Sequence, residues 1–415
     1  MVESTGDAEL LTDGDLRAVA ALGSVDVLVG VPARNQSRSV THVLEAVWTG
    51  LTTALLDRKS AVVVLAAGFQ DETLDAVKEW TASRPAQPPI CCVRIAGPPS
   101  RSRVMLGLLD ILRRLESPVC ALADAGLVSL TPETLRRLVQ PILAGEADYV
   151  SPAYTHTVAE GTLTTNLLAP MCRALYGRRV QQLLGGCAAV SQRIAARLLD
   201  THASHGDPTD EGLEMRLLIE TLASGERIVE VHAGRKTLDA GLAPTDLATT
   251  LAQTVGPFFR LMDRYREVWS EIGGSVSVPR IGDPPSILPE AGEVQLERMV
   301  RGFRLGLKDL LPIWEQVLQE ETLGLLYPLG LLSPDEFVFP VEHWARVAID
   351  FAVASHERRL PRDHLPRALT PLYLGRVAAF LRETQGASPP RIATALEAIG
   401  GAFEAAKPAL AARWR

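Results

Sequence analysis

The chain has 415 residues, which at roughly 150 residues per domain predicts two or three domains. Hydrophobic residues make up 47% of it and charged residues 22%, a composition too apolar for a disordered protein. Acidic residues number 49 against 42 basic ones, for a formal net charge of −7. This balance argues against a nucleic acid as the main partner.

The sequence shows no sign of export or of a membrane span. Its longest apolar runs, at residues 25–32 and 62–68, are far shorter than the roughly 20 residues that cross a bilayer. Residues 1–15 are acidic and lack the basic and apolar blocks of a signal peptide. The 5 cysteines have no C-x-x-C spacing, which favours reduced thiols over a zinc site or disulfides. We therefore expect a cytoplasmic protein that does not bind membranes.

Strands and helices alternate from residue 25 onward, after a polar leader at residues 1–24. Continuous apolar runs typical of buried strands occur at residues 25–31, 61–65, 90–95 and 118–123. Apolar residues at helical spacing separate them, at residues 40–47, 71–80 and 104–115. The alternation predicts an α/β fold, Rossmann-like, with a mostly parallel sheet and helices on both faces. Ligands of such sheets bind at the carboxyl ends of the strands.

Helical patterns dominate the second half of the chain. Before residue 272 we predict helices at 135–143, 161–178 (interrupted near Pro170), 213–222 and 256–269, with short strands at 148–151 and 228–232. A stretch rich in glycine, proline and serine at 272–289 predicts a boundary. Helices then follow at 296–310, ended or bent by Pro312, and at 341–355, 371–383 and 390–406. We therefore predict an α/β domain at residues 25–282 and a helical domain at residues 283–415.

Asp124 directly follows the fourth predicted strand. A carboxylate at this edge can hold a divalent cation that a nucleotide diphosphate also binds. It can equally cap the following turn by accepting a backbone N–H. The residues alone leave both interpretations open.

Two loops at the same edge could bind a phosphorylated ligand. Pro32 and Asn35 suit a tight turn after the first strand, and Arg34 with nearby backbone N–H groups could meet a base or a phosphate. Arg101 and Arg103 precede a helix, which suits phosphate capture, although a solvated basic turn explains one of them more simply. The chain has neither a P-loop nor a G-x-G-x-x-G motif after the first strand.

Residues 183–191 and 212–216 contain further candidates. Gly185 and Gly186 indicate a close approach of the backbone to another group. Cys187 has no partner at a catalytic spacing, so we expect a buried, inert thiol. Glu214, at the start of a predicted helix, could orient a sugar hydroxyl or act as a first-turn acid that the helix dipole favours.

Several of these segments resemble one family. The strand followed by VPARNQS (residues 31–37) resembles the V-x-P-A-x-N-E opening of GT-A glycosyltransferases, and ALADAGL (121–127) resembles their D-x-D strand end. Residues 161–191, 234–239, 263–269, 337–346 and 364–380 resemble retaining enzymes of the glucosyl-3-phosphoglycerate, glucosylglycerate and mannosylglycerate synthase group. The likeness covers most of the chain from about residue 25.

This resemblance implies a GT-A fold and transfer of a hexose from a UDP-, GDP- or ADP-sugar, with retention of configuration. The acceptor would be glycerate, phosphoglycerate or a similar small hydroxy acid, and the product a compatible solute or its precursor. The implied residues are Asp124 and Glu214 for catalysis, and Thr164, Asn166, Gly185 and Gly186 for the acceptor. The nucleotide sugar would contact Pro32, Arg34, Asn35, Asp71, Arg101, Arg103, Asp124 and Lys236.

The chain also departs from the family's pattern. Gly126 stands at the second acid of the D-x-D site and Leu238 at the metal-binding histidine of G-x-K-x-H, so Asp124 alone remains to hold Mg²⁺ or Mn²⁺. Cys187 stands where an acid follows the glycine pair, PSRSR (99–103) replaces G-K-G-[DE], and Gln36 replaces the first-loop glutamate.

Two hypotheses follow. The first is an active glycosyltransferase that needs little or no metal, with Arg101, Arg103 and Lys236 supplying the positive charge. The second is an inactive pseudo-glycosyltransferase that binds or regulates an active paralogue. In either case we expect a homodimer.

Overall fold

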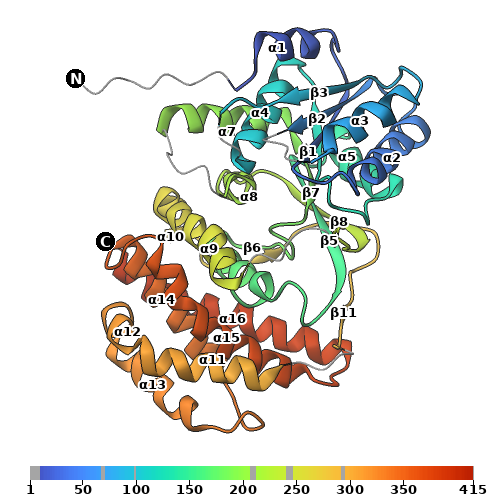
Figure 1. Cartoon of the computed structure of the whole chain (residues 1–415). Coiled ribbons are helices and arrows are strands. Elements are labelled where there is room, and N and C mark those ends of the chain that lie inside the picture. The colour runs from blue at the N-terminus through green and yellow to red at the C-terminus, as the bar shows by residue number, and fades with distance from the viewer. Residues whose placement is uncertain are drawn as a thin grey trace. The chain divides into compact units, whose positions relative to one another are not determined.

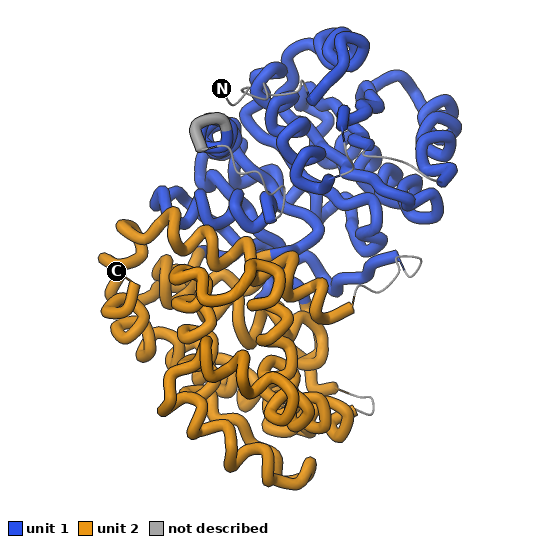
Figure 2. Tube along the Cα trace, turned by 60° about the vertical axis from the view of Figure 1, so that its left-hand side comes forward, with its two compact units in different colours: residues 1–154, 184–244, 279–284 blue, residues 155–183, 245–278, 285–415 orange. Residues whose placement is uncertain are grey.

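The computed structural model describes residues 10–66, 71–97, 100–205, 212–239, 246–290 and 295–414, and for residues 203–205 only the backbone. The chain forms two compact units, each assembled from separate stretches of sequence (Figure 2). Unit 1 contains residues 1–154, 184–244 and 279–284, and unit 2 contains residues 155–183, 245–278 and 285–415. The single boundary predicted at residue 283 lies near residues 284 and 285, where the chain passes from unit 1 to unit 2 for the last time. Residues 155–183 and 245–278, which we placed in the α/β domain, belong to unit 2.

Unit 1 is built on a mostly parallel sheet with the strand order β10-β8-β5-β7-β4-β1-β2-β3. Strands β1, β2, β3 and β4 run parallel, and β7 is antiparallel to both β4 and β5. The strands are β1 (Val27–Ala33), β2 (Ser60–Ala66), β3 (Ile90–Arg94), β4 (Val119–Ala123), β5 (Tyr149–Thr157), β7 (Cys187–Ser191), β8 (Ile228–Arg235) and β10 (Arg280–Ile281). The last residues of β5 lie in unit 2, where they pair with β11 (Ile287–Leu288).

Helices cover both faces of this sheet (Figure 1). On one face α2 (Val40–Thr49), α3 (Thr73–Ala82) and α5 (Pro132–Leu143) enclose a core with the valine side chains of β1 and β2. On the other face α4 (Arg101–Arg114) contacts β1, β2 and β4 and also meets α7 (Gln192–His205) and α8 (Leu213–Ala223). The chain also forms α1 (Asp13–Ala20) beside β3, and a π-helical turn, η1 (Gly50–Ala54), after α2. The predicted α/β architecture with helices on both faces is confirmed.

Strand β7 and helix α7 are the main elements of unit 1 that the pattern did not predict. Residues 187–191 contain two alanines and one valine, too weak an apolar run to indicate a strand by itself. The strand is buried between β4 and β5, so its tertiary neighbours rather than its own propensity specify it.

Unit 2 is almost entirely helical. Its helices are η2 (Thr164–Leu168), α6 (Ala169–Tyr176), α9 (Leu247–Arg264), α10 (Arg266–Ser270), α11 (Leu296–Asp309), α12 (Leu311–Val317), α13 (Glu320–Leu331), α14 (Val341–His356), α15 (His364–Thr384) and α16 (Pro389–Arg413). Two short strands, β6 (Arg178–Arg179) and β9 (Val276–Ser277), pair in parallel. The core contains the buried rings of Phe303, Phe339 and Trp344. The predicted helical region is therefore confirmed.

Prolines in unit 2 had the predicted effect at one position and not at another. Pro312 lies in the first turn of α12, directly after α11 ends, as the pattern predicted. The predicted start of a helix at residue 371 is wrong, because α15 begins at His364 and contains Pro371 in its interior. A proline removes one helical hydrogen bond, but residues on both sides of Pro371 are buried against other helices, and this packing offsets the loss.

None of the helices among the described residues is long and apolar enough to cross a membrane.

Candidate functional site

The predicted site residues of unit 1 gather where the strand order of its sheet reverses. From β1 the chain proceeds to β2 and β3 on one side, whereas β4 lies on the other side of β1 and parallel to it. Open α/β sheets bind their ligands at the carboxyl ends of strands at such a reversal. The loop after β1 and Asp124 after β4 both lie at this edge, as the sequence predicted.

The carboxylate of Asp124 accepts hydrogen bonds on both oxygens. Its Oδ1 accepts from the Nε2 amide of Gln36 at 3.0 Å and from the backbone N–H of Gly126 at 2.8 Å. Its Oδ2 lies 2.9 Å from Nη2 of Arg101. Asp124 therefore does cap the following turn, one of the two interpretations left open above, and it also forms an ion pair.

Arg101 joins two carboxylates that are far apart in the sequence. Its Nη2 lies 2.7 Å from Oε1 of Glu214, and its Nε donates to the same oxygen at 2.9 Å. Arg101 is the first residue of α4 and Glu214 lies in the first turn of α8, so two helix ends supply the pair. The negative charge of Glu214, and to a smaller extent that of Asp124, raises the pKa of Arg101 above its ordinary value although desolvation opposes this. The guanidinium thus lies between two acids and places a positive charge beside Asp124.

Lys236 supplies a second cation to the same cluster. Its Nζ donates to the carbonyl of Leu184 at 3.3 Å and lies 5.8 Å from the ring centre of Tyr154. Desolvation lowers the pKa of Lys236, while negative charge acts in the opposite direction, on Cys187 when that thiol is ionised and on Glu214 and Asp124. The pKa of Lys236 responds to these groups, so they share one electrostatic environment.

The glycine pair lies against this cluster. A Cβ on Gly185 would come within 2.3 Å of the side chain of Pro152, so only glycine fits there. The carbonyl of Gly186 accepts from the backbone N–H of Asp124 at 2.8 Å, and the carbonyl of Gly185 accepts from the Tyr154 hydroxyl at 2.9 Å. The pair therefore makes the close backbone approach that the sequence predicted.

Cys187 is buried beneath the glycine pair. Its Sγ lies 3.1 Å from the hydroxyl of Tyr154. Burial raises the pKa of the Cys187 thiol to about 11, and the hydrogen bond from Tyr154 and the charge of Lys236 only partly offset this effect. The thiol is therefore protonated at neutral pH, in agreement with the expected inert side chain.

The loop after β1 is held by its own polar groups. The backbone N–H of Arg34 donates to Oε1 of Gln36 at 2.9 Å, leaving the Arg34 side chain exposed at the edge of the sheet. Asn35 has a left-handed backbone with φ of 53°, as a tight turn requires, and the carbonyl of Pro32 accepts from the N–H of Ala125 at 3.1 Å. This loop therefore forms hydrogen bonds with both Asp124 and Ala125.

Asp71 is engaged in capping. Its carboxylate accepts from the backbone N–H of Thr73 at 3.0 Å and from that of Ser37 at 3.2 Å. Desolvation acts to raise the pKa of Asp71, but the hydrogen bonds from Thr73 and Ser37 together hold it below its ordinary value. Asp71 thus connects the start of α3 to the loop after β1.

The remaining predicted site residues are Arg103, Thr164 and Asn166. The guanidinium of Arg103 donates to the carbonyl of Ala96 at 2.8 and 3.1 Å, a contact that closes its own loop. Thr164 and Asn166 belong to unit 2. The carbonyl of Asn166 accepts from the Trp344 indole at 2.6 Å and its side-chain oxygen from Arg376 at 3.3 Å, so its polar groups serve the core of that unit.

The side chains around Asp124 offer few oxygen ligands to a divalent cation. Gly126 has no side chain, and Leu238 presents an exposed apolar side chain, 47% accessible, in place of a histidine. Both oxygens of Asp124 are already bound by protein donors, and Gln36 turns an N–H rather than an oxygen toward them. Within the described part of the chain, no three acidic, cysteine or histidine side chains form a group able to bind a metal. Mg²⁺ and Mn²⁺ need several oxygen ligands, which this donor set does not supply.

Glucosyl-3-phosphoglycerate synthases are among the solved structures that are similar to this chain. Glucosyl-3-phosphoglycerate synthase from Mycobacterium tuberculosis, in complex with Mn²⁺, UDP and phosphoglyceric acid, is 20% identical, with 61% of this chain and 83% of that chain covered and a TM-score of 0.43. The same enzyme with Mn²⁺, UDP-glucose and phosphoglyceric acid is 20% identical over 66% of this chain and 94% of that one, with a TM-score of 0.43. A structure described as a mycobacterial protein is 19% identical over 60% and 78%, with a TM-score of 0.44.

The chain resembles glucosyl-3-phosphoglycerate synthases. No family model matches the sequence, and no curated protein matches it.

Two residues of the cluster were not predicted as members of it. In the sequence, Gln36 was noted only as a departure from a family motif. Its side-chain amide nevertheless donates a hydrogen bond to Asp124. Tyr154 lies in a long buried strand and gave no signal of its own. Its proximity to Gly185, Cys187 and Lys236 depends on the pairing of β5 with β7, which local sequence does not reveal.

Proposed function

We propose that the chain is a retaining glycosyltransferase that moves a hexose from a nucleotide diphosphate sugar to a small hydroxy acid such as glycerate or phosphoglycerate, without a metal ion. The observation that supports this proposal most directly is the position of the Arg101 guanidinium between Asp124 and Glu214, at the reversal of strand order. The motif resemblance of residues 31–37, 121–127 and 161–191 supports the reaction class.

The charge balance of the cluster supports a metal-independent reaction. Asp124 and Glu214 are formally negative and Arg101 and Lys236 formally positive, so the four groups sum to zero. A diphosphate that departs from the sugar gains negative charge in the transition state, and fixed cations can stabilise that charge as a metal does. In our proposal Arg101 exchanges one carboxylate for the diphosphate, while Lys236 supplies the second positive charge.

The proposed roles of the other residues follow from their positions. The exposed side chain of Arg34 and the turn at Asn35 would contact the nucleotide, and the carbonyls and N–H groups of Gly185 and Gly186 would line the sugar or acceptor side. The predicted contributions of Arg103, Thr164 and Asn166 remain predictions. The polar groups of Arg103 and Asn166 bind other parts of the protein.

The alternative is a pseudo-glycosyltransferase, and one observation favours it. Asp124 is saturated by Gln36, Gly126 and Arg101 without any ligand, so the cluster is stable as it stands. A protein with this site could bind a nucleotide sugar or a paralogue and have no turnover.

Turnover in the presence of EDTA distinguishes the two. The full chain is incubated with UDP-, GDP- and ADP-glucose and -mannose and with glycerate or 3-phosphoglycerate, and the nucleoside diphosphate released is measured. We expect release that depends on the acceptor, persists in EDTA and gives an α-linked product by NMR. Thermal stabilisation by a nucleotide sugar without any release would support the pseudoenzyme, and absence of both effects would contradict both proposals.

Arg101→Met tests the role of the guanidinium. Loss of a charged donor at the transition state lowers kcat by roughly 100- to 1,000-fold, so we expect a decrease of that size. Arg94→Met is the matched control, because Arg94 is an exposed arginine at the end of β3 outside the cluster, and its activity should stay at the wild-type level. The double change Gly126→Asp and Leu238→His tests the alternative. If the wild type binds a nucleotide sugar without turnover and Mn²⁺ gives turnover only in this variant, the wild type is the pseudoenzyme.

A further inference from the structure

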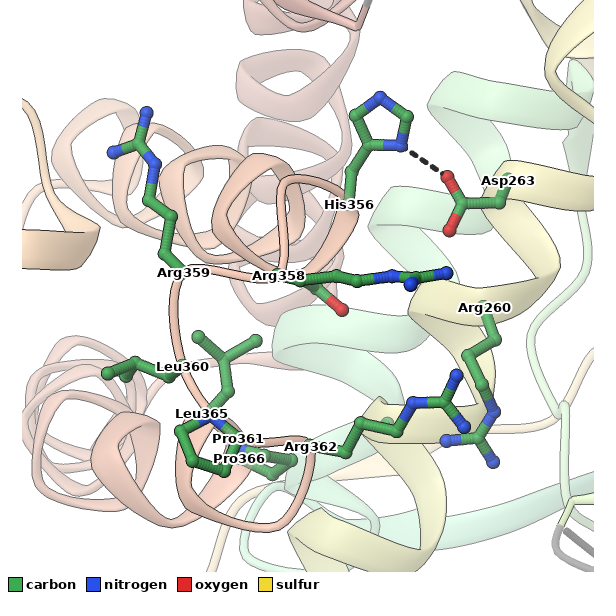
Figure 3. A pocket seen from close by; sticks show the side chains of 12 residues that line it. Arg260, Asp263, His356, Arg358, Arg359, Leu360, Pro361, Arg362, Leu365 and Pro366 are labelled. Carbon is green, nitrogen blue, oxygen red and sulfur yellow. Dashed lines mark hydrogen bonds and ion pairs between the residues drawn. The ribbon is translucent and has the colours of Figure 1, made fainter.

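Unit 2 contains a cavity of about 710 Å³ that the proposed transfer reaction does not use. All of its lining residues belong to unit 2. They come from the second half of α9 and from the segment that connects the end of α14 to the start of α15 (Figure 3). The volume is within the range of small-molecule sites, roughly 300–1,000 Å³.

The lining is strongly basic in an acidic chain. Among the lining residues are the arginines Arg260, Arg358, Arg359 and Arg362, and Asp263 is the only carboxylate. The Oδ1 of Asp263 lies 2.6 Å from Nδ1 of His356, so that carboxylate is already engaged. Like charges that face one space repel one another, and an anion in that space would relieve the repulsion.

Three of the arginines point toward a common space. In Figure 3 the side chain of Arg358 extends toward Asp263 and Arg260, and the side chain of Arg362 extends from the connecting segment toward Arg260. Within the described part of the chain, the guanidinium groups of Arg358 and Arg362 form no hydrogen bond or ion pair. Arg359 differs: its guanidinium points away and binds Glu357 and the carbonyl of Gln316.

Arg358 has a backbone conformation that an arginine rarely adopts. Its φ is 56°, in the left-handed region, where glycine is the usual residue after a helix. The N–H of Arg358 donates to the carbonyl of Ser355 and that of Arg359 to the carbonyl of Ala354, the two bonds of a Schellman motif. The helix end therefore favours glycine at residue 358, yet the chain carries a long cation there that extends into the cavity.

Apolar side chains form another part of the lining. Leu360, Pro361, Leu365 and Pro366 belong to it, and Leu365 and Pro366 are buried. A ligand with a charged end and a carbon framework would satisfy both parts. The guanidinium fork matches two oxygens of a phosphate group, which an ammonium cannot do.

We propose that this cavity binds a small phosphorylated metabolite, with its phosphate held by Arg260, Arg358 and Arg362. The carbon framework lies over Leu360 and Leu365. The site is separate in its residues from the Arg101 cluster, so it does not depend on the proposed transfer reaction. A metabolite bound there would give the protein a second ligand.

Isothermal titration calorimetry of the full chain tests the proposal. The ligands are inorganic pyrophosphate, 3-phosphoglycerate, glucose 1-phosphate and ADP. Each titration is repeated on the Arg101→Met variant, in which any phosphate site of unit 1 is impaired. We expect at least one probe to bind the Arg101→Met variant with unchanged affinity. If no probe binds the wild type, or if Arg101→Met abolishes all binding, the proposal is wrong.

The matched pair Arg358→Gly and Arg359→Gln distinguishes a built site from general basic charge. Both remove one positive charge from adjacent residues. We expect Arg358→Gly to lower the affinity at least tenfold while the melting temperature without ligand stays the same or rises, because glycine fits the left-handed backbone. We expect Arg359→Gln to change the affinity less than threefold.

Two results would overturn this assignment. Equal losses of affinity in the two variants would show that only the net charge matters. A tenfold loss of affinity in Arg358→Gly together with a lower melting temperature would show that Arg358 supports the fold of the loop. Arg362→Gln then decides, because Arg362 is exposed and its replacement leaves the fold intact. Unchanged affinity in Arg362→Gln contradicts the site.

Discussion

At the scale of single residues, the amide of Gln36 determines what Asp124 can bind. An amide N–H donates to Oδ1 of Asp124 at 3.0 Å, whereas a glutamate there would present an oxygen and need a cation between the two carboxylates. One side-chain atom thus determines whether residue 36 donates a hydrogen bond to Asp124 or repels it. The guanidinium of Arg101 binds the other oxygen of Asp124, Oδ2, so both oxygens have protein donors.

Gln36→Glu should destabilise the protein in the absence of metal. Two carboxylates at hydrogen-bond distance repel, so the pKa of one rises, and we expect a loss of about 1–3 kcal/mol at pH 7. Because the folded pKa is raised, the folded state takes up a proton first as the pH falls, so the loss should shrink toward pH 5. Urea unfolding at pH 7 and pH 5 measures it.

Gln36→Met is the control for this prediction, because it removes the hydrogen bond and adds no charge. Its destabilisation should not depend on pH in the same range. Equal behaviour of the two variants would mean that charge repulsion is not the cause.

At the scale of elements, the contact between β1 and α4 depends on Gly30. A Cβ on Gly30 would lie 2.1 Å from the side chain of Leu108 in α4, and the residues on both sides of Gly30 in the strand are buried. The missing side chain lets α4 lie close to the sheet, and the same helix carries Arg101 at its first residue.

Gly30→Ala should therefore cost about 1–3 kcal/mol, the range for overpacking a core. Gly273→Ala is the control, since no atom lies within 4 Å of the position of its Cβ, and it should unfold like the wild type. Chemical denaturation of both variants measures the difference. A stable Gly30→Ala variant would mean that α4 can shift without loss.

Helix α16 carries a buried amine that makes stability depend on pH. Lys407 donates to the carbonyls of Leu175 and Ile272, and desolvation lowers its pKa from 10.5 to about 8. Below pH 8 the charged amine is buried at full cost in the folded state. As the pH rises from about 8 to 10.5 the folded protein loses this proton before the unfolded chain does, so the cost is relieved.

The free energy of unfolding of the wild type, relative to Lys407→Met, should therefore rise across pH 8 to 10.5. The rise amounts to at most about 3 kcal/mol. Denaturation of both proteins at several pH values gives this difference and cancels the titration of all other groups. A difference that stays constant across the window would contradict the lowered pKa.

At the scale of the whole molecule, each unit is assembled from stretches that are separate in the sequence. Within unit 2, Arg173 of α6 forms ion pairs with Glu397 and Glu404 of α16 at 2.7 and 2.8 Å. The rings of Trp269 and Trp414 meet edge to face, with centroids 5.6 Å apart, and both are buried. Residues 155–183 and 245–278 thus supply part of the core of the helical unit.

A fragment of residues 283–415 should therefore fail to fold cooperatively, although the sequence pattern presents it as a helical domain. It lacks Arg173 and Trp269 and would expose the apolar faces that these segments cover. Circular dichroism during heating should show a broad, weak transition beside the sharp transition of the full chain. A sharp transition in the fragment would mean that residues 283–415 form an independent domain.

Local sequence was sufficient for most of the architecture. The apolar runs that became β1, β2, β3 and β4, and the helical periodicity that became α2, α4 and α14, depend on the repeat of side chains along one segment. Asp124 could be placed at a strand end for the same reason. Helix α7 was not predicted either. Strand β7 and the start of α15 are exceptions whose burial among distant neighbours outweighs their own pattern.

The site was accessible from the sequence only as a set of candidates. Sequence reasoning identified Asp124 at a strand end, Arg101 and Glu214 at helix starts, and Lys236 through the family resemblance. The fold alone brings Arg101 to both acids, because Arg101 and Glu214 are 113 residues apart. The same holds for the basic cavity, in which Arg260 of α9 meets Arg358 and Arg362 from the segment between α14 and α15. The periodicity of a sequence shows which face of a segment is buried. It does not show which distant charged residues come together, because that depends on long-range packing, which only the tertiary structure decides.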